Sequence, residues 1–344
     1  MQKDFAETLI RWQKQFGRHQ LPWQTEDPYS RWVSEVMLQQ TQVVTVIAYF
    51  KRFMERFPTV RALAEAREDD VMALWAGLGY YSRARNLHRA AKMLVDQYGG
   101  FFPTTRTEWE ALPGIGRSTA AAIVAFSFGR KETILDGNVK RVLARYFAIE
   151  HSLEGARATR DLWTLAESLL PDHDIESYVQ GLMDLGATVC TRNPSCTVCP
   201  FCQSCKANQL GRQNALPVAK TKKTRPEKEA TFFLLWTGDC FFVEKRVDKG
   251  VWQGLYCLPQ VDGVVDELSA EQFWRQKGAS VQNARKLSPV VHDFSHYRLH
   301  LYPIALKLRN ESALPSGLWV KASEMQHVAL PVPIEALVKA FFFH

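Results

Sequence analysis

Hydrophobic residues recur every three to four positions along roughly the first 205 residues, which is the pattern of amphipathic helices. The clearest run follows Ser30, which we expect to cap a helix, and ends before Pro58. No convincing strand interrupts this part, so it reads as an all-α domain. The further helices expected are Val71–Leu78, Leu87–Val95 (ending at Gly99-Gly100), Glu108–Leu112, Ser118–Phe128, Val139–Ile149, Ala158–Leu169 and Tyr178–Ala187.

The pattern changes beyond a basic stretch, residues 206–229, in which Lys and Arg stand among small and polar residues with two prolines. This composition predicts an extended linker, either a solvated tether or a strap along a phosphate backbone, or both. Residues 230–344 then read as a separate α+β domain. Its expected strands are Phe232–Trp236, Phe241–Lys245, Tyr256–Leu258 and Leu299–Leu308, and its expected helices are Ser269–Lys277 and Ile334–Phe342. The fold class is therefore multidomain, with the all-α domain over 1–205.

Composition and charge limit the function classes. With 344 residues, 46% hydrophobic and 23% charged, the chain reads as a globular protein of about two domains. It has no apolar signal core at its N-terminus and no apolar run near the ~20 residues that span a bilayer, so we expect a cytosolic protein without membrane association. A net charge of +7 permits binding to a polyanion without demonstrating it.

Five of the seven cysteines lie between Cys190 and Cys205, and a cluster in a cytosolic chain favours metal over disulfides. Four thiolates in one loop suit a [4Fe–4S] cluster or tetrahedral zinc, and spacing alone does not decide between them. Cys240 and Cys257 stand alone in apolar surroundings and are expected in the core. The clustered spacing is Cys190-x5-Cys196-x2-Cys199-x5-Cys205, with Cys202 inside it.

Residues 112–120 read Leu-Pro-Gly-Ile-Gly-Arg-Ser-Thr-Ala. Gly114 and Gly116 would form a tight turn between two helices and let backbone N–H groups approach a phosphate. The helix that starts near Arg117 adds its dipole and free amides. An ordinary helix–helix turn is the plain alternative, but the pattern favours a helix-hairpin-helix motif that grips the DNA backbone without reading sequence.

Three longer motifs carry a family resemblance: Ser34–Gln42 (Ser-Glu-Val-Met-Leu-Gln-Gln-Thr-Gln), Gly77–Asn86 and Ile134–Arg141. They resemble the signatures of MutY-type adenine glycosylases. The hairpin and the cysteine loop are similar to those of the helix-hairpin-helix superfamily that includes endonuclease III. The resemblance spans about residues 8–205 and resumes in the C-terminal domain.

The resemblance implies two catalytic carboxyl groups. Glu35 would be the general acid that protonates a ring nitrogen, so that adenine can leave. Asp136 would stabilise the oxocarbenium-like sugar or bond to it transiently, with Asn138 holding Asp136 or a phosphate in place. Glu35 and the glutamines at 39 and 42 stand at i, i+4 and i+7, which predicts one helix face. The plain alternatives are that Glu35 is a surface residue and that Asp136 only caps a helix.

Ser118 stands where bifunctional members of the superfamily carry a lysine that forms a Schiff base with the sugar. Serine cannot do this, so the resemblance implies a monofunctional enzyme. Lys140 lies nearby in sequence, but the family gives it no comparable role.

The target adenine has to leave the duplex to be reached, and side chains must fill the gap. Gln40 and Tyr80 match the wedge residues of the family. Trp23 matches the wall of the adenine pocket, and Gln24 follows it where the family often has an arginine.

The cysteine loop departs from the family pattern, since five residues instead of six separate the first two cysteines. The resemblance implies a [4Fe–4S] cluster on Cys190, Cys196, Cys199 and Cys205, with Cys202 in reserve. We expect the cluster to staple a loop that presents Arg192 and Lys206 to DNA.

The C-terminal domain contains Trp252–Pro259 (Trp-Gln-Gly-Leu-Tyr-Cys-Leu-Pro), which resembles part of a Nudix-like domain. The candidate magnesium helix, Ala270–Lys277, lacks the Arg-Glu-x-x-Glu-Glu core, so we expect a domain kept for recognition rather than catalysis. Phe294, Ser295 and His296 match the loop with which MutY-type enzymes detect 8-oxoguanine; a polar hairpin loop is the plain alternative.

The resemblance thus implies a monofunctional adenine DNA glycosylase of base excision repair, acting on A:8-oxoG or A:G mispairs in double-stranded DNA. We expect a monomer in the cytoplasm, associated with the nucleoid. Three alternatives remain: an endonuclease III-like pyrimidine glycosylase/lyase, an iron–sulfur DNA sensor, and a Nudix pyrophosphatase with a DNA-binding appendage. Ser118 argues against the glycosylase/lyase, and the pair Glu35 and Asp136 argues against a sensor without catalysis. The missing magnesium helix argues against the pyrophosphatase.

Overall fold

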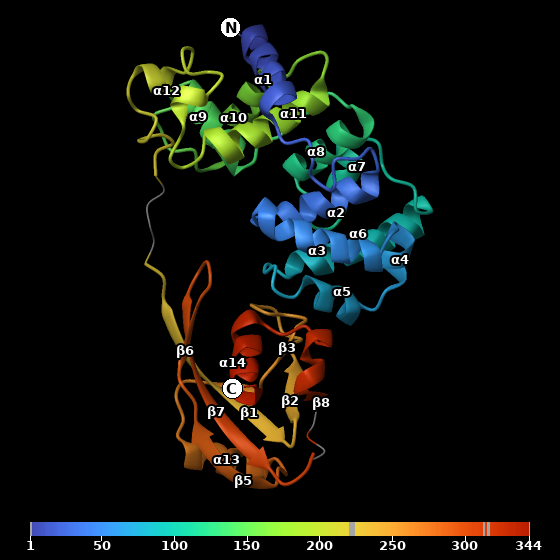
Figure 1. Cartoon of the computed structure of the whole chain (residues 1–344), viewed down its shortest axis with the longest axis vertical. Coiled ribbons are helices and arrows are strands. Elements are labelled where there is room, and N and C mark those ends of the chain that lie inside the picture. The colour runs from blue at the N-terminus through green and yellow to red at the C-terminus, as the bar shows by residue number, and fades with distance from the viewer. Residues whose placement is uncertain (1, 220–223, 312–313, 315–316, 344) are drawn as a thin grey trace. The chain divides into compact units, whose positions relative to one another are not determined.

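The computed structural model describes residues 2–219, 224–311, 314 and 317–343, and Figure 1 shows its elements. Contacts between Cα atoms divide the chain into two compact units, Met1–Glu65 with Asn86–Lys222 and Ala66–Arg85 with Lys223–His344. The segment Ala66–Arg85 therefore groups with the C-terminal unit, although its sequence position placed it inside the expected helical domain 1–205. In the described ranges, no helix has both the length and the hydropathy to cross a bilayer.

The first unit is helical, and its described residues form no strand, as the hydrophobic pattern predicts. One hydrophobic core of this unit joins α1 to the helices from α8 to α11. Phe5 of α1 stacks on Phe201 at 4.6 Å between ring centroids, which anchors the cysteine loop to this core. Its elements are α1 (Gln2–Phe16), α2 (Pro28–Leu38), α3 (Val43–Arg56), α4 (Val60–Glu65), most of α6 (Ser82–Tyr98), α7 (Arg106–Glu110), α8 (Arg117–Phe128), α9 (Gly137–Tyr146), α10 (Ala156–Ser168), α11 (Ile175–Asp184), the π-helix η1 (Leu185–Val189), the 3-10 helix η2 (Cys196–Val198) and α12 (Lys206–Gln209).

The single helix expected from Ser30 to Pro58 is wrong, because the structure has two helices there. Asp27, not Ser30, caps α2: its carboxylate accepts hydrogen bonds from the backbone N of Tyr29 at 3.2 Å and of Ser30 at 2.9 Å. Gln40 has a φ of 58° and ends the helical path. The apolar period continues through the break because both helices bury one face.

The break also corrects the expected polar stripe. Gln39 is the C-cap of α2 and Gln42 is the N-cap of α3. Gln42 therefore belongs to the next helix and does not lie on the face of α2 that carries Glu35, whereas Gln39 ends α2 one turn after Glu35.

The expected linker 206–229 is extended over only part of its length. Residues 206–209 form α12, and the side chains of Ala207 and Leu216 are buried. Arg145 donates from Nε to the backbone O of Leu216 at 2.9 Å. The first part of the stretch is therefore folded and contacts α9, while residues 220–223 lie outside the described ranges.

The second unit is built on a mixed eight-stranded sheet with the path β3-β2-β1-β7-β5. β1 and β7 are parallel, and β4, β6 and β8 pair antiparallel with β1, β7 and β2. The four expected strands and two expected helices are present, but β4, β5, β6 and β8 were missed. The elements are α5 (Glu68–Trp75), β1 (Glu227–Thr237), β2 (Cys240–Lys245), β3 (Tyr256–Cys257), β4 (Gln260–Asp262), α13 (Glu267–Gln276), β5 (Val281–Lys286), β6 (Val290–Asp293), β7 (Arg298–Leu308), β8 (Gly317–Lys321), the 3-10 helix η3 (Ala322–His327) and α14 (Val332–Phe342).

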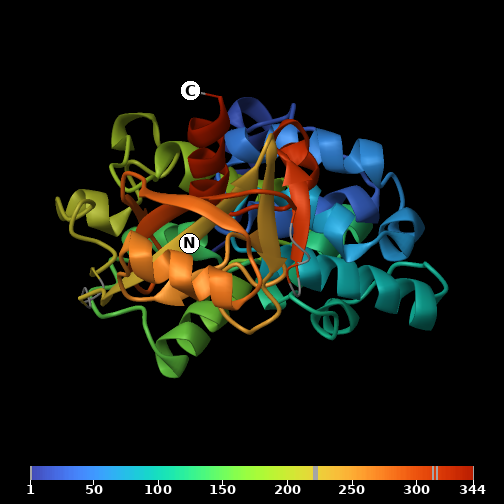
Figure 2. The ribbon, with the colours of Figure 1, turned by 90° about the horizontal axis from the view of Figure 1, so that it is seen from below.

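Helices cover both faces of this sheet (Figure 2). Phe233 of β1 meets Trp274 of α13 with ring centroids 5.7 Å apart, while Trp236 meets Phe341 of α14 at 5.3 Å. Since neighbouring strand residues point to opposite faces, this odd–even division puts α13 and α14 on opposite sides. Cys240 and Cys257 are buried, as expected.

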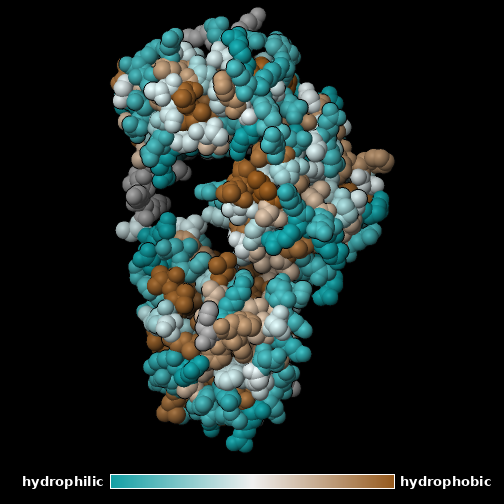
Figure 3. Space-filling view, viewed as in Figure 1, coloured by the Kyte–Doolittle hydropathy of each residue, from teal (hydrophilic) through white to brown (hydrophobic). Residues whose placement is uncertain are grey.

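Most of the surface seen in Figure 3 is hydrophilic, with hydrophobic residues in separate groups. Among the large hydrophobic side chains that remain exposed are Val44, with 74% of its surface accessible, and Tyr80, with 48%. Tyr80 belongs to a motif that the sequence analysis singled out for contact with DNA.

Candidate active site

Glu35 lies in the second half of α2, a helix that buries nearly all its other residues. Burial raises the pKa of Glu35, the charge of Arg31 opposes this rise and the charge of Asp136 adds to it, giving a value of about 7. A group with this pKa exists in both protonation states near neutrality, which suits a general acid. Glu35 is therefore not an ordinary solvated surface residue.

Asp136 is the N-cap of α9, where its Oδ1 accepts a hydrogen bond from the backbone N of Val139 at 2.8 Å. Asn138 donates from Nδ2 to Oδ2 at 3.5 Å, a long contact. Burial raises the pKa of Asp136, whereas its hydrogen bonds and the charge of Arg141 lower it. Asp136 thus does cap a helix through Oδ1, and its second oxygen makes the long contact with Asn138.

The two carboxyl groups come from segments about a hundred residues apart in sequence, α2 and the start of α9. The charge of Asp136 contributes to the raised pKa of Glu35, which requires the two groups to lie near one another. The structure therefore brings together the two residues that the family motifs single out.

The hairpin has the geometry of a backbone-binding turn. Gly114 has a φ of 78°, and a Cβ added there would lie 2.7 Å from Cβ of Asn86, so only glycine fits. Gly116 is the N-cap of α8, and a Cβ added there would meet no heavy atom within 4 Å. Gln39 donates from Nε2 to Thr119 Oγ1 at 3.2 Å, which ties the end of α2 to the hairpin.

Ser118 has a structural contact that its motif does not reveal. Its Oγ accepts a hydrogen bond from the backbone N of Leu135 at 3.0 Å. Leu135 directly precedes Asp136, so position 118 lies beside the segment that presents the second carboxyl group.

All five clustered cysteines line one small pocket, together with Arg145 and Asn208. Arg145 donates from Nη1 to Sγ of Cys190 at 3.4 Å, and Asn208 donates from Nδ2 to Sγ of Cys202 at 3.7 Å. No group of three or more His, Cys, Asp or Glu residues arranged for a single metal ion is found in the described part of the chain. Sulfur donors around a shared pocket are the set that a [4Fe–4S] cluster takes, so the residues fit this cofactor.

Two arginines that the sequence analysis missed link these features. Arg141 donates from Nη2 to Oδ1 of Asn138 at 2.9 Å and to the backbone O of Gly186 at 2.6 Å, and from Nε to the backbone O of Cys190 at 2.8 Å. It thus joins the partner of Asp136 to the π-helix η1 and to the first cysteine. Its position three residues after Asn138 on one helix was the available signal. The second arginine that the sequence analysis missed is Arg31, four residues before Glu35 on α2.

Gln40 and Tyr80, the expected wedge residues, share an unusual backbone. Their φ angles are 58° and 49°, a region that non-glycine residues rarely adopt. Both side chains are exposed, Gln40 between α2 and α3 in the first unit and Tyr80 in the turn after α5 in the second. Each residue is thus presented outward by a tight turn.

Trp23, the expected pocket wall, is 3% exposed and meets the ring of Phe50 edge-on at 5.4 Å. It offers little of its surface in this structure. Gln24 accepts from the backbone N of Leu21 at 2.8 Å and donates to the backbone O of Arg18 at 2.6 Å, so it closes the preceding loop. Gln24 therefore has a structural role where the family often has an arginine.

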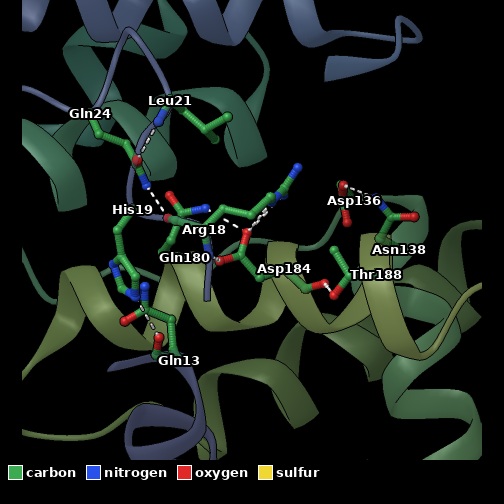
Figure 4. A network of polar contacts seen from close by, with 10 residues as sticks. All are labelled: Gln13, Arg18, His19, Leu21, Gln24, Asp136, Asn138, Gln180, Asp184 and Thr188. Carbon is green, nitrogen blue, oxygen red and sulfur yellow. Dashed lines mark hydrogen bonds and ion pairs between the residues drawn. The ribbon is translucent and has the colours of Figure 1, made fainter. Parts of the chain in front are cut away.

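Figure 4 shows the buried polar network that continues from this loop. Asp184 is fully buried and accepts from the backbone N of Arg18 at 2.8 Å and from its Nε at 2.7 Å. Gln180 donates from Nε2 to the same carboxylate at 2.8 Å. The network fixes the loop before Trp23 to α11.

The second unit contains a pocket of about 440 Å³ lined by the turn that carries Tyr80, by Trp252 and by the loop between β6 and β7. Phe294 lies in this loop with its ring 5.2 Å from that of Trp252. Ser295 Oγ and His296 Nδ1 are 3.3 Å apart. The backbone N of Phe294 donates to the backbone O of Tyr297 at 2.9 Å, so the three expected lesion-reading residues sit at a hairpin tip.

Comparison with protein families defines the class. Residues 33–168 match the HhH-GPD superfamily of base excision DNA repair proteins, and residues 231–340 match the NUDIX domain. A thermostable thymine-DNA glycosylase is similar in structure, with a TM-score of 0.54 and 28% identity over 61% of this chain and 97% of that one. A non-covalent endonuclease III–DNA complex has a TM-score of 0.51 at 22% identity, over 61% of this chain and 98% of that one, and shows the fold alone.

Curated relatives narrow the class. The adenine DNA glycosylase of Buchnera aphidicola subsp. Acyrthosiphon pisum (strain APS) is 36% identical over 98% of this chain and 97% of the relative. The adenine DNA glycosylase of Homo sapiens is 32% identical over 98% of this chain and 74% of the relative. The chain belongs to the adenine DNA glycosylase family, as its motifs predicted.

Proposed function

We propose that this chain is a monofunctional glycosylase that removes adenine paired with 8-oxoguanine or guanine in double-stranded DNA. One observation carries the proposal: Glu35 and Asp136 come from separate helices and interact through their charges, with Glu35 at a pKa of about 7. We infer that they would act as an acid and a carboxylate on two sides of one glycosidic bond. We assign adenine as the base that is removed because the chain belongs to the adenine DNA glycosylase family.

The reaction is a hydrolysis. Glu35 gives its proton to a ring nitrogen of adenine, and the bond between that base and C1′ of the sugar breaks with its electron pair going to the base. Asp136 stabilises the positive sugar as an anion or bonds to it briefly; burial raises the pKa of Asp136, and its cap hydrogen bonds and the charge of Arg141 oppose this rise. Water then adds to C1′ and gives up a proton, which restores Glu35. The products are free adenine and an abasic site.

Ser118 supports a reaction that stops there. Its side chain carries a hydroxyl group, which accepts a hydrogen bond from the backbone N of Leu135, and no amine. No Schiff base forms on this residue, and the DNA strand stays intact.

The residues expected to contact DNA have separate roles in this proposal. Gly114 and Gly116 would bring backbone N–H groups to a phosphate, and the exposed Gln40 and Tyr80 would fill the stack when adenine leaves it. Trp23 would border the base. We propose a monomer working on chromosomal DNA, and therefore in the cytoplasm at the nucleoid.

Cys190, Cys196, Cys199 and Cys205 would hold the [4Fe–4S] cluster, with Cys202 in reserve. The cluster, when bound, supplies a structural cross-link of this loop and no step of the hydrolysis. The exposed Arg192 and Lys206 would then be presented to the phosphate backbone.

The hairpin tip Phe294–His296 would read the lesion opposite adenine. A hydroxyl and an imidazole can recognise the N7–H and O8 groups that distinguish 8-oxoguanine from guanine. Phe294 is fixed on Trp252, so its two neighbours are presented from a rigid base.

A duplex assay tests this function. Purified protein should release adenine opposite 8-oxoguanine and, more slowly, opposite guanine, should spare adenine opposite thymine, and should leave the strand unbroken until alkali is added. Release of a pyrimidine instead, or strand breaks that keep pace with base release without alkali, would contradict it.

A further inference from the structure

Arg31 is a charged residue in the interior of α2. Its side chain is 3% exposed, among helix neighbours that are apolar or small. A buried charge is costly unless it is paired and hydrogen-bonded, and guanidinium groups stay protonated in proteins. Such a residue calls for a physical role beyond packing.

Three contacts fix the guanidinium group. Nε donates to the backbone O of Thr25 at 2.7 Å, Nη2 forms an ion pair with Oε1 of Glu176 on α11 at 2.9 Å, and the group lies over the ring of Phe126 at 4.5 Å from its centroid. A cation held from three sides has little freedom to follow a ligand. Its field at neighbouring groups is therefore constant.

Glu35 stands one helical turn further along α2, at i+4, on the side chain row that neighbours Arg31. The charged groups that act on Glu35 are Arg31 on its own helix and Asp136 at the start of α9. Glu176 acts through Arg31, and its own side chain is 57% exposed. The charges of one cation and one anion therefore act on the acid in opposite directions.

We propose that Arg31 is a positioning residue for adenine excision, whose fixed positive charge sets the fraction of Glu35 that carries a proton. The inference rests on the proposed role of Glu35 as the acid. Burial and Asp136 both raise the pKa of Glu35, and Arg31 is the group that opposes them. Without it, Glu35 would hold its proton too tightly to transfer it efficiently near neutral pH.

The proposal makes two opposite predictions. Arg31→Met keeps the long apolar stem against Phe126 and removes the charge, so the pKa of Glu35 should rise by about one unit. Glu176→Gln removes the counter-ion and strengthens the field of Arg31, so the pKa should fall by about half a unit. Arg31→Lys keeps the charge and should restore most of the wild-type value.

The test follows single-turnover adenine release against pH. Because the acid acts in its protonated form, the rate falls as pH rises through the pKa of Glu35. The alkaline limb should move up in Arg31→Met, down in Glu176→Gln, and stay within about 0.3 units of the wild type in Arg31→Lys. Glu150→Gln, which opens a comparable exposed ion pair with Arg212, should not move it.

A direct titration keeps this inference separate from the proposed function. The carboxyl carbon signal of Glu35 in glutamate-labelled protein, assigned by its loss in Glu35→Gln, reports its pKa whether or not adenine is released. Opposite shifts in the two variants support the role of Arg31. Unchanged titration in both, shifts of the same sign, or a rate lowered equally at every pH would overturn it; absence of base release with the expected titration shifts would instead overturn the function.

Discussion

Burial raises the pKa of Glu35 and the charge of Asp136 adds to this rise, although about a hundred residues separate the two in sequence. In the proposed reaction the two groups have different roles, Glu35 as the acid and Asp136 as the carboxylate. Burial raises the pKa of both groups, but at Asp136 two hydrogen bonds from α9 and the charge of Arg141 oppose this rise. Two carboxyl groups whose surroundings separate their protonation states can serve as acid and anion in one reaction.

Asp136→Asn separates the chemical role from the cap. Asparagine caps helices as well as aspartate does, so the fold should remain, while loss of the anion should slow single-turnover excision by about 100-fold or more. Asp136→Ala, which loses the cap as well, should be about 1 kcal/mol less stable but equally inactive. Near-normal excision by the Asp136→Asn variant would mean that Asp136 only caps the helix.

Glu35→Gln should stabilise the protein in a pH-dependent way. The folded pKa of about 7 exceeds the unfolded value of about 4.3, so the folded state binds more protons between these values and wild-type stability falls with rising pH there. The variant has no such loss. Its free energy of unfolding should match the wild type near pH 4 and exceed it above pH 7 by on the order of 3 kcal/mol. Denaturation at pH 5 and pH 8 measures this, and an equal difference at both values would exclude a raised pKa.

Ser118→Lys should introduce Schiff-base chemistry. An amine at this position would lie beside the segment that carries Asp136, so borohydride should trap a covalent complex with substrate DNA. Ser118→Ala serves as the control, since it loses only the hydrogen bond to Leu135 and should trap nothing. Failure of the lysine variant to trap DNA would mean that position 118 does not face the sugar.

Ser295→Ala should weaken lesion recognition without touching catalysis. Loss of one hydrogen bond to 8-oxoguanine should reduce the preference for A:8-oxoG over A:G about five- to tenfold, with the rate on A:G unchanged. Ser168→Ala, an exposed serine of the first unit, is a suitable control. Truncation near residue 220 should have a larger effect of the same kind. If the ratio of the two rates stays constant in both, Phe294–His296 has no reading role.

Cys199→Ser should lose the cluster, whereas Cys202→Ser should keep it. Purified wild-type protein should be brown with about four irons per chain. Iron and acid-labile sulfide analysis, with visible absorbance, distinguishes the two variants without any activity assay. Loss of iron in Cys202→Ser and its retention in Cys190→Ser would reassign the ligands.

The sequence predicted most helices and the core strands from local periodicity, and it predicted the family from three long motifs. It did not reveal the break at Gln40, since the apolar period runs through it and only a left-handed backbone marks it. Its basic composition predicted an extended linker over 206–229, although residues 206–209 form a helix and the side chains of Ala207 and Leu216 are buried. The sequence did not single out Arg31, because its contacts with α11 and Phe126 form only in the tertiary structure.

Excision of adenine from an A:8-oxoG duplex by wild-type protein and by Glu35→Gln, under single-turnover conditions with matched duplex binding, tests the central claim most directly. Rapid release by the wild type and none by the variant, with both bound equally well, is the result we expect. Release by Glu35→Gln at close to the wild-type rate would contradict it.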